Sequence, residues 1–277
     1  MKTIVTHLSP DLDAIAAVWL IKKYLPGWKN AIVKFVPAGT TLDNIAPDDN
    51  PEIIHVDTGL GKFDHHQSNQ FTCASQLVYE YLIHQKHIGS KDANALERIT
   101  ELITEFDHFH ECFYPDPTSD RYNVMINEIV EGLKKTVNND LNVLDLTFKL
   151  LEATLINFKN KLSAEHELKK GYEFRSKWGK TLIVSTANSE VGKLAMKMGF
   201  NLVVTKNPDK GYVRIKTPPS KNNDLTPLYK KILKIDPNST WFFHSSKRML
   251  LNGTSKNPTM KATSLTIAQL IEIVKGV

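Results

Sequence analysis

Eight acidic and histidine side chains in the N-terminal half of the sequence fall beside predicted strand or helix ends. They are His7, Asp11, Asp13, Asp57, Asp64, His65, His66 and Asp107. Unit charges about 4 Å apart repel by roughly 4 kcal/mol at an effective dielectric constant of about 20. Carboxylates that the fold brings together must therefore bind cations or take up protons. Oxygen-rich ligands with a few imidazoles suit Mn²⁺ or Mg²⁺ better than structural zinc, so the set predicts a divalent-cation site.

Two divalent ions about 3.5–4 Å apart would share a carboxylate and hold a bridging water as hydroxide near neutral pH. Such a hydroxide attacks phosphorus in line, while the ions stabilise the entering and leaving oxygens. Single residues also have simpler explanations, because Asp11 and Asp13 in a first helical turn suit the helix dipole. Asp57 suits a turn and Asp107 a helix end. Paired histidines after an aspartate are harder to explain in this way, so the joint pattern favours two-metal hydrolysis.

Strands and helices alternate around the first of these residues. Residues 3–7, 31–37 and 52–59 are β-branched or apolar and are predicted strands. The apolar helix DLDAIAAVWLIKKYL is expected to begin with Ser9 as N-cap and Pro10 at the first helical position. This alternation predicts an α/β fold with a doubly wound, mostly parallel sheet. In such sheets the site lies at the carboxyl ends of the strands.

Helical periodicity dominates the middle of the chain, and strands return after it. Helices are predicted at 73–87, 91–106, 120–136 and 140–170. The later strands are EFRSKWG, TLIVSTA, LVVTKN, YVRIKTP, WFFHS and RMLLNG, with helices at 189–198, 224–235 and 265–275. We therefore expect a second, smaller α/β domain. The predicted boundaries are a catalytic metal-binding domain at 1–135, a helical linker at 136–170 and a basic substrate-binding domain at 171–277.

Charge divides sharply along the chain. Residues 1–170 contain 17 Lys/Arg and 24 Asp/Glu, a formal charge of −7. Residues 171–277 contain 18 Lys/Arg and 6 Asp/Glu, a formal charge of +12. An acidic half suits divalent cations, and a basic half suits a polyanion such as a nucleotide or nucleic acid. The alternative is two solvated faces of opposite sign that dock on each other.

Bulk composition is that of an ordinary soluble globular protein, with 41% hydrophobic and 23% charged residues in 277. Cys73 and Cys112 form no CxxC pair, and charged residues come too early for a signal peptide. Both features favour a reducing cytoplasm. Apolar runs are too short to span a membrane, so no membrane partner is expected. The sequence does not indicate an oligomeric state.

The ordered motifs resemble those of the DHH phosphoesterase family. THLSPDLDA resembles the first motif, VDTG the second, FDHHQ the third and FDHF the fourth, and TCASQLVYEYL resembles the helix after the third. The match covers roughly residues 3–110. This resemblance implies one ion held by His7, Asp11 and Asp57, and a second held by Asp13, Asp57, His65 and Asp107.

The same resemblance implies roles for the remaining residues and the metal. Asp57 would bridge two ions, with Mn²⁺ preferred and Mg²⁺ or Co²⁺ as alternatives. His66 would contact the scissile phosphate, and Asp64 would orient the histidines. His108 and His110 are expected to be surface residues.

The basic half departs from the common family pattern. Many DHH phosphoesterases carry a glycine-rich GGGH segment that binds substrate, and this sequence has none. A strand-borne arginine or a Ser/Gly turn can also hold phosphate. The candidates of this kind are Arg214 and the run His244, Ser245, Ser246, Lys247 and Arg248, followed by Asn252-Gly253-Thr254. The alternative is a surface strand residue and a solvated hairpin turn.

Two further details suggest a branch of the family. The interval from Asp57 to Asp64 is short, and the ending FFHSSKRMLLNG is similar to that of the melanocyte-proliferating-gene family of RNA exonucleases. We therefore expect a phosphoesterase that hydrolyses phosphodiester or phosphomonoester bonds of nucleotides or short single-stranded oligonucleotides. The alternatives are an inorganic pyrophosphatase, or a non-catalytic nucleotide- or RNA-binding protein on the same scaffold.

Overall fold

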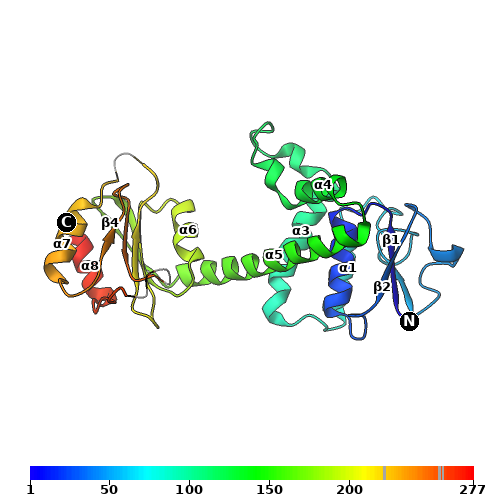
Figure 1. Ribbon diagram of the computed structural model, residues 1–277, viewed down its shortest axis with the longest axis horizontal. Coiled ribbons are helices and arrows are strands. Elements are labelled where there is room, and N and C mark those ends of the chain that lie inside the picture. The colour runs from blue at the N-terminus through cyan, green and yellow to red at the C-terminus, as the bar shows by residue number, and fades with distance from the viewer. Residues whose placement is uncertain (221–222, 255–256, 258) are drawn as a thin grey trace. The chain divides into compact units, whose positions relative to one another are not determined.

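The computed structural model describes residues 1–220, 223–254, 257 and 259–277. It divides into two compact units, Met1–Lys159 and Asn160–Val277, which are shown in Figure 1. The division falls within the long helix α5 (Asp140–Leu168), which lies inside the predicted linker 136–170.

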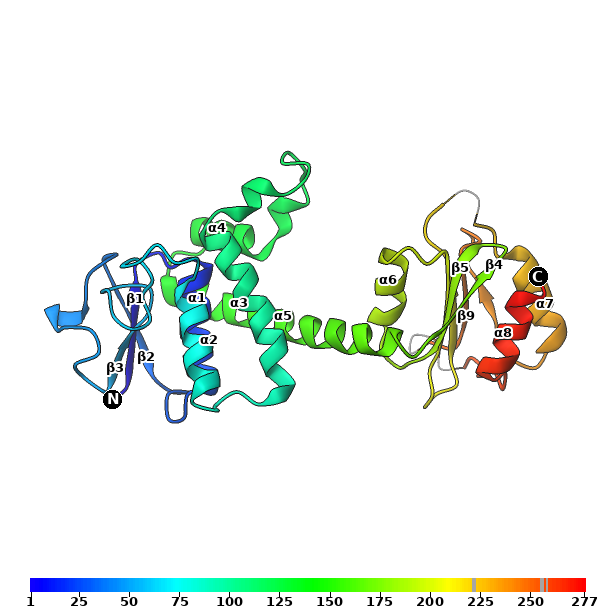
Figure 2. The ribbon, with the colours of Figure 1, turned by 180° about the vertical axis from the view of Figure 1, so that it is seen from behind.

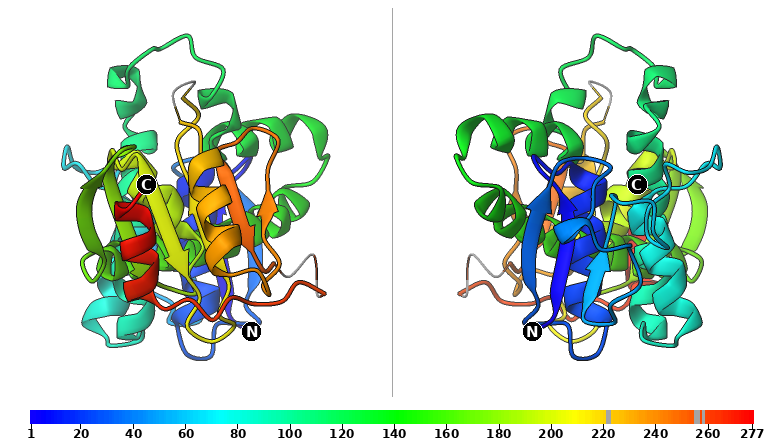
Figure 3. Two further views of the ribbon diagram at one scale, coloured as in Figure 1. Left: turned by 90° about the vertical axis from the view of Figure 1, so that its left-hand side faces the viewer. Right: turned by 90° about the vertical axis from the view of Figure 1, so that its right-hand side faces the viewer.

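A parallel three-stranded sheet forms the base of the first unit. Strands β1 (Thr3–His7), β2 (Ile32–Val36) and β3 (Ile53–His55) follow the spatial order β2-β1-β3, as the right view of Figure 3 shows. The chain moves to one side of β1 to form β2 and to the other side to form β3. This reversal is the switch point at which open α/β sheets place their ligands. His7 ends β1, and Asp57 lies two residues beyond β3.

Helices of the first unit pack on one another beside this sheet. Figure 2 shows α1 (Leu12–Tyr24), α2 (Ala74–His84) and α3 (Ser90–Asp107) on the same side of the strands. Every residue of α1 from Leu12 to Ile21 is buried, as its apolar sequence predicts. The unit also contains α4 and short 3₁₀ helices, at Ile126–Thr136, Leu42–Asn44, His110–Phe113 and Tyr122–Val124.

The start of α1 corrects one detail of the sequence prediction. Ser9 is not the N-cap, because it has a φ of 51° and its backbone N–H donates to Asp140 Oδ2 at 2.9 Å. Asp11 caps the helix instead, and its Oδ1 accepts a hydrogen bond from Ala14 N at 3.0 Å. Asp is as good an N-cap as Ser and adds a favourable charge at the helix N-terminus. The later start leaves Asp11 in the turn that follows His7.

The second unit is a six-stranded mixed sheet with the order β4-β5-β6-β7-β9-β8. Strands β5 and β6 are parallel and are joined by α6 (Glu190–Lys197), and the other neighbours are antiparallel. The strands are β4 (Tyr172–Ser176), β5 (Gly179–Ser185), β6 (Leu202–Lys206), β7 (Val213–Lys216), β8 (Phe242–Phe243) and β9 (Met249–Asn252). Parallel pairing across a helix is what the βαβ pattern of this segment predicts.

Alternating strand residues bury both faces of this sheet. Ile183 and Val204 pack with α7 (Thr226–Ile235) and α8 (Ile267–Lys275). Leu182, Val184 and Val203 point the other way and form a separate core with residues of α5 and α6. Figure 1 shows α6 on one side of the sheet and α7 and α8 on the other. The period of two along each strand explains the two-sided core.

The predicted fold class is therefore confirmed: an α/β unit with a parallel sheet is followed by a smaller α/β unit. The third strand is shorter than predicted. Residues 57–59 leave the sheet because Asp57 and Gly59 have φ values of 54° and 82°, which no strand accommodates. Within the described residues, no helix has the length and apolar character needed to cross a membrane.

Candidate metal centre and anion pocket

Asp57 lies at the centre of side chains that come from separate segments of the first unit. Its Oδ2 is 3.2 Å from His7 Nε2, and its Oδ1 is 3.4 Å from His65 Nε2 and 3.7 Å from His66 Nδ1. His65 Nε2 is also 3.5 Å from Asp107 Oδ2, at the end of α3. The fold thus brings together residues far apart in the sequence.

A closed loop after β3 brings the DHH residues back to Asp57. The backbone N–H of Asp57 donates to Phe63 O at 2.9 Å, which closes the loop. Leu60, like Asp57, has a positive φ, here 58°. A left-handed backbone at non-glycine residues is strained and occurs often at functional sites. The result of this strained path is the placement of residues 64–66 beside the end of β3.

Asp64 holds this loop and orients His66. Its Oδ2 accepts from Leu60 N at 2.7 Å, and its Oδ1 accepts from His66 N at 3.1 Å. The same Oδ1 lies 2.7 Å from His66 Nδ1, so that ring nitrogen donates to the carboxylate. The His66 side chain is 60% exposed, and its other nitrogen, Nε2, is free of this contact. The arrangement presents an imidazole of defined tautomer beside the centre.

His7 is held in a similar way by the backbone. Its Nδ1 lies 2.9 Å from Leu8 O and donates to it, which directs Nε2 toward Asp57. With the proton on Nδ1, the Nε2 lone pair of a neutral imidazole is available to a cation. Burial acts to lower the pKa of His7, but the hydrogen bonds to Asp57 and Leu8 outweigh it and raise the pKa to about 9.

Proximity shifts the other titrating groups as well. The Asp57 carboxylate, 3.4 Å from the ring, raises the pKa of His65 to about 9, although burial opposes this. Burial is the main cause that raises the pKa of Asp11 and of Asp13, and the charge of Asp57 is the second. The pKa of Asp13 rises to about 7. Burial is also the main reason that the pKa of Asp107 is raised to about 6. In the absence of cations, bound protons neutralise part of the negative charge of these carboxylates.

Asp57 itself shifts in the opposite direction. Burial acts to raise the pKa of Asp57, but the adjacent His65 and His7 imidazoles hold it well below its usual range. The central carboxylate is therefore ionised over the whole physiological range of pH.

Asp11 caps α1, as its simpler explanation predicts, whereas Asp13 accepts hydrogen bonds at the start of a different helix. Asp11 caps α1 and also lies with His7 and Asp57 in one group of ligand atoms within 4.8 Å of one another. Asp13 is 2% exposed, and its Oδ2 and Oδ1 accept from Ala74 N at 2.7 Å and from the next backbone N–H at 2.8 Å. It therefore caps α2, and no ligand group found among the described residues includes it.

Three groups of side chains in the described part of the chain have metal-ligand spacing. They are Asp57-His65-His66, His65-Asp107-His108 and His7-Asp11-Asp57. The first and third share Asp57, as a bridging ligand requires. His108, which was expected to be only a surface residue, belongs to the second group, and its signal was its position directly after Asp107.

Two atoms at the centre test whether cations fit. Asp57 Oδ1 and His65 Nε2 are buried and have no hydrogen-bond partner among the described residues. Their separation of 3.4 Å is an ion-pair distance without hydrogen-bond geometry. Buried polar atoms without partners are costly, and cations would satisfy both. The donors are carboxylate oxygens and imidazole nitrogens, which suit Mn²⁺ or Mg²⁺. The residues present fit divalent cations.

Metal-free protein should lose stability as the pH rises from 6 to 9, because the pKa of His7 and of His65 is raised from 6.5 to about 9. Both imidazoles bind protons more tightly in the folded state than in the unfolded state. Their contribution to the free energy of unfolding is therefore complete below pH 6.5 and is lost as the pH approaches 9. Asp13 and Asp107, with pKa raised to about 7 and about 6, act in the same direction at lower pH. The lowered pKa of Asp57 has the opposite effect on stability, but only at acidic pH, where Asp57 would take up a proton.

The measurement is the Tm of EDTA-treated protein across this pH range, with and without Mg²⁺. We expect a decrease of several degrees without metal, and a stabilisation by Mg²⁺ that grows with pH because the ion replaces protons. A metal-free Tm that stays constant or rises from pH 6 to pH 9 would show that these groups are not coupled as described.

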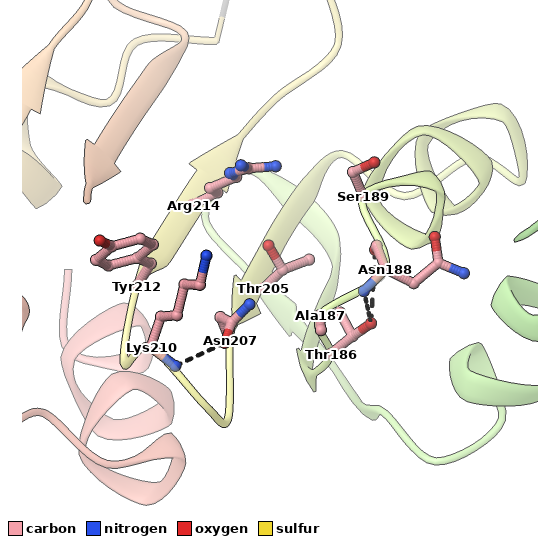
Figure 4. A pocket seen from close by; sticks show the side chains of 9 residues that line it. All are labelled: Thr186, Ala187, Asn188, Ser189, Thr205, Asn207, Lys210, Tyr212 and Arg214. Atoms are coloured by element: carbon pink, nitrogen blue, oxygen red, sulfur yellow. Dashed lines mark hydrogen bonds between the residues drawn. The ribbon is translucent and has the colours of Figure 1, made fainter. Parts of the chain in front are cut away.

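Arg214 lies in a cavity of about 280 Å³ in the second unit, shown in Figure 4. The cavity opens at the carboxyl ends of the parallel strands β5 and β6, beside the start of α6. Its lining residues are Thr186, Ala187, Asn188, Ser189, Thr205, Asn207, Lys210, Tyr212 and Arg214. We call it the Arg214 pocket. Its position relative to the strands is that of ligand sites in α/β sheets.

The chemistry of the Arg214 pocket suits an anion. Its lining has two cationic side chains, Arg214 and Lys210, and the described lining residues include no carboxylate. The turns are held by hydrogen bonds from Lys210 N to Asn207 Oδ1 at 2.8 Å and from Asn188 N to Thr186 Oγ1 at 2.9 Å, drawn in Figure 4. Two cations with amide and hydroxyl groups can surround a phosphate.

The other predicted substrate residues lie elsewhere in the second unit. Residues 244–248 form the turn between β8 and β9 and do not line the Arg214 pocket. There His244 Nδ1 lies 2.8 Å from Ser246 Oγ, and Lys247 Nζ lies 3.7 Å from Asp224 Oδ2. Asn252 is buried, and its amide donates to Thr240 O and Lys261 O. Several missed pocket residues had a signal, since they lie at or just beyond the carboxyl ends of the predicted strands TLIVSTA and LVVTKN.

The protein family described as ChrB, C-terminal domain, matches residues 4–158 of this chain. This match spans more than half of the chain. The chain belongs to the ChrB C-terminal domain family. The ChrB-family region contains all eight residues of the predicted metal centre, whereas the Arg214 pocket lies outside it.

No curated protein matches the sequence. Solved structures similar to this ChrB-family chain include a DHH domain described as belonging to a family of ribosomal proteins. Its sequence is 10% identical to this one, the match covers 98% of this chain and 84% of that chain, and the TM-score is 0.32. Another is an exopolyphosphatase-related protein from Bacteroides fragilis, with 11% identity over 98% and 89% and a TM-score of 0.28.

A third structure is a putative family II inorganic pyrophosphatase from Methanococcus jannaschii. Its identity is 13% over 99% of each chain, with a TM-score of 0.22. All three TM-scores are too low to support a conclusion about the ChrB-family chain. None of the three descriptions points to the melanocyte-proliferating-gene branch.

Proposed function

We propose that this chain is a metal-dependent phosphoesterase whose centre lies at the switch point between β1 and β3. The observation that carries the proposal is the buried pair Asp57 Oδ1 and His65 Nε2, which face each other at 3.4 Å without hydrogen-bond partners among the described residues. His7 and Asp107 complete the surroundings of this pair. The resemblance of the motifs to those of DHH phosphoesterases supports the same chemistry.

Two divalent ions would bind here, Mn²⁺ by preference and Mg²⁺ or Co²⁺ as alternatives. The first would be held by His7, Asp11 and Asp57, and the second by Asp13, Asp57, His65 and Asp107. Asp13 would use the lone pairs that its two helix-capping hydrogen bonds leave free. Bound ions of this kind polarise phosphoryl oxygens and lower the pKa of water.

The side chains would divide the remaining work. Asp64 fixes the His66 ring through Nδ1, so that Nε2 can donate to a non-bridging oxygen of the scissile phosphate when it carries a proton. The Leu8 carbonyl keeps the His7 proton on Nδ1, away from the centre. Both contacts preorganise the imidazoles before substrate arrives, which is the main source of electrostatic catalysis.

The Arg214 pocket would bind a phosphate of the substrate, by way of Arg214 and Lys210. Because residues 171–277 carry a formal charge of +12, a nucleotide or a short single-stranded oligonucleotide would be attracted to the second unit. The turn with Lys247 and Arg248 would offer further positive charge to a longer chain. The proposed domains are then a metal-binding catalytic one and a substrate-binding one.

The experiment that tests the proposed function is a substrate panel with Mn²⁺. Nucleotides, dinucleotides, short RNAs and inorganic pyrophosphate would be assayed before and after EDTA treatment. Metal-dependent hydrolysis of the nucleic-acid compounds supports the proposal. Faster release of phosphate from pyrophosphate would favour the pyrophosphatase alternative, and tight binding without turnover would favour a binding protein.

Substituting Arg214 with glutamine tests the Arg214 pocket. We expect the KM for a 5′-phosphorylated dinucleotide to rise about ten-fold or more, because a charged hydrogen bond to phosphate is lost. The matched control is Arg175→Gln, at an exposed position on the edge strand β4. Equal KM values for the two variants would remove Arg214 from substrate binding.

A further inference from the structure

Aromatic and imidazole rings form a continuous row that begins at the candidate metal centre. The His65 and His108 ring centroids are 6.1 Å apart. The Phe71 ring lies 4.6 Å from that of His108 and 4.6 Å from that of His110. The His110 ring in turn meets Phe113 edge-on at 5.5 Å. We call Phe71, His108, His110 and Phe113 the ring row.

The ring row is exposed to an extent unusual for phenylalanine. Phe71 is 54% exposed and Phe113 is 79% exposed, and His108 and His110 are also exposed. Phenylalanine is normally among the buried residues, and adjoining exposed apolar groups commonly mark a binding surface. None of the four side chains belongs to the buried core. Packing of the unit therefore does not account for them.

Local contacts hold the rings in place. His108 Nε2 donates to Thr72 O at 2.9 Å, which ties the end of α3 to the segment that carries Phe71. Phe109 has a left-handed backbone with a φ of 53°, and the short 3₁₀ helix His110–Phe113 begins directly after it. This turn brings His110 back to Phe71. The surface is therefore preorganised, which reduces the entropy lost on binding.

We propose that the ring row is a stacking surface for the base of the substrate, and that it makes nucleotides the substrate class of the centre. This inference rests on the proposed phosphoesterase function. Bases stack on aromatic and imidazole faces with little dependence on sequence or charge. Stacking suits a region that carries a formal charge of −7 over residues 1–170 and offers phosphate few cations of its own.

Continuity with the centre selects this occupant. His108 belongs to a ligand group with His65 and Asp107, and the next ring in the row is Phe71. A base on the ring row would therefore lie beside its own phosphate at the ions. Inorganic pyrophosphate has no group that could use these rings, so the ring row separates the two chemical classes.

The test uses a phosphonate-linked dinucleotide that carries 2-aminopurine and cannot be hydrolysed. Its fluorescence is quenched when the base stacks, so binding is read without turnover. We expect quenching by the wild-type protein with Mn²⁺, and an affinity about ten-fold lower in Phe71→Ala, as base stacking on one ring predicts. Phe71→Trp should restore binding. Phe242→Ala, 50% exposed in the second unit, is the matched control and should bind like wild type.

Two companion measurements separate this inference from the proposed function. Mn²⁺ affinity by calorimetry should be the same in Phe71→Ala as in wild type, because Phe71 is not a ligand. Hydrolysis of an abasic dinucleotide should be equal in both proteins, whereas the base-bearing one should be cleaved more slowly by the variant. Absence of quenching in wild type, or equal quenching in Phe71→Ala, would overturn the stacking surface even if hydrolysis were found. Absence of any Mn²⁺-dependent hydrolysis would contradict the proposed function alone, since Phe71-dependent quenching would still support base binding.

Discussion

Replacing Asp57 with asparagine should lower kcat/KM for phosphoester hydrolysis by about a thousand-fold, equivalent to several kcal/mol of transition-state stabilisation. Asp57 faces His7 through one oxygen and His65 through the other, so it is the carboxylate that two ions would share. An amide has nearly the same shape but only one oxygen and no charge. It cannot bridge two cations, so the variant should also bind fewer Mn²⁺ ions.

Asp49→Asn is the matched control for this substitution. Asp49 lies exposed in the loop before β3 and takes no part in the ligand groups of the described residues. Circular dichroism and Tm should show both variants folded, so that loss of activity reports on the site. An Asp57→Asn protein with near-normal turnover in Mn²⁺ would refute the bridging role.

His66→Gln should lower kcat by about a hundred-fold or more while leaving Mn²⁺ affinity nearly unchanged, the size of effect found when one charge-stabilising donor is removed. The His66 ring nitrogen Nδ1 is engaged by Asp64, and the ring is largely exposed, so its free Nε2 is placed for substrate. Asp64→Asn should give a smaller loss, since it removes only the group that orients His66.

The comparison for His66 is His84→Gln, an exposed histidine at the end of α2. Steady-state kinetics and calorimetry with Mn²⁺ on the same preparations distinguish the two roles of an imidazole. A His66→Gln protein that loses Mn²⁺ affinity along with kcat would make His66 a metal ligand, consistent with its place in the group Asp57-His65-His66.

Much of the architecture follows from local patterns in the sequence. The β-branched stretch 3–7 and the apolar helix after it form β1 and α1. A short continuous β-branched run indicates a buried strand, and a helix that is apolar on all sides is a buried helix. The order of the second-unit elements from β4 to α8 was also predictable. The proximity of His7 and Asp57 follows from the rule that strand ends meet at one edge of a parallel sheet.

Other features depend on contacts between distant residues and have no local signature. Asp13 caps α2 through Ala74 N, and nothing near Asp13 in the sequence indicates that partner. Asp11 rather than Ser9 caps α1, and the Ser9 N–H donates instead to Asp140, far along the chain. Similarly, Phe71 meets His110 only because two loops approach each other. Sequence patterns indicate which residues could act as ligands or catalysts, and the tertiary fold determines which side chains they contact.

The positions of bound Mn²⁺ would show directly whether Asp57 bridges two ions. A crystal of the protein soaked in Mn²⁺, with anomalous diffraction measured at the manganese edge, would show where the ions lie. We expect two peaks about 3.5–4 Å apart, with Asp57 between them and His7 and His65 on opposite sides. No peak within reach of Asp57, or a single ion bound away from His65, would show that Asp57 is not the bridging ligand of a two-metal centre.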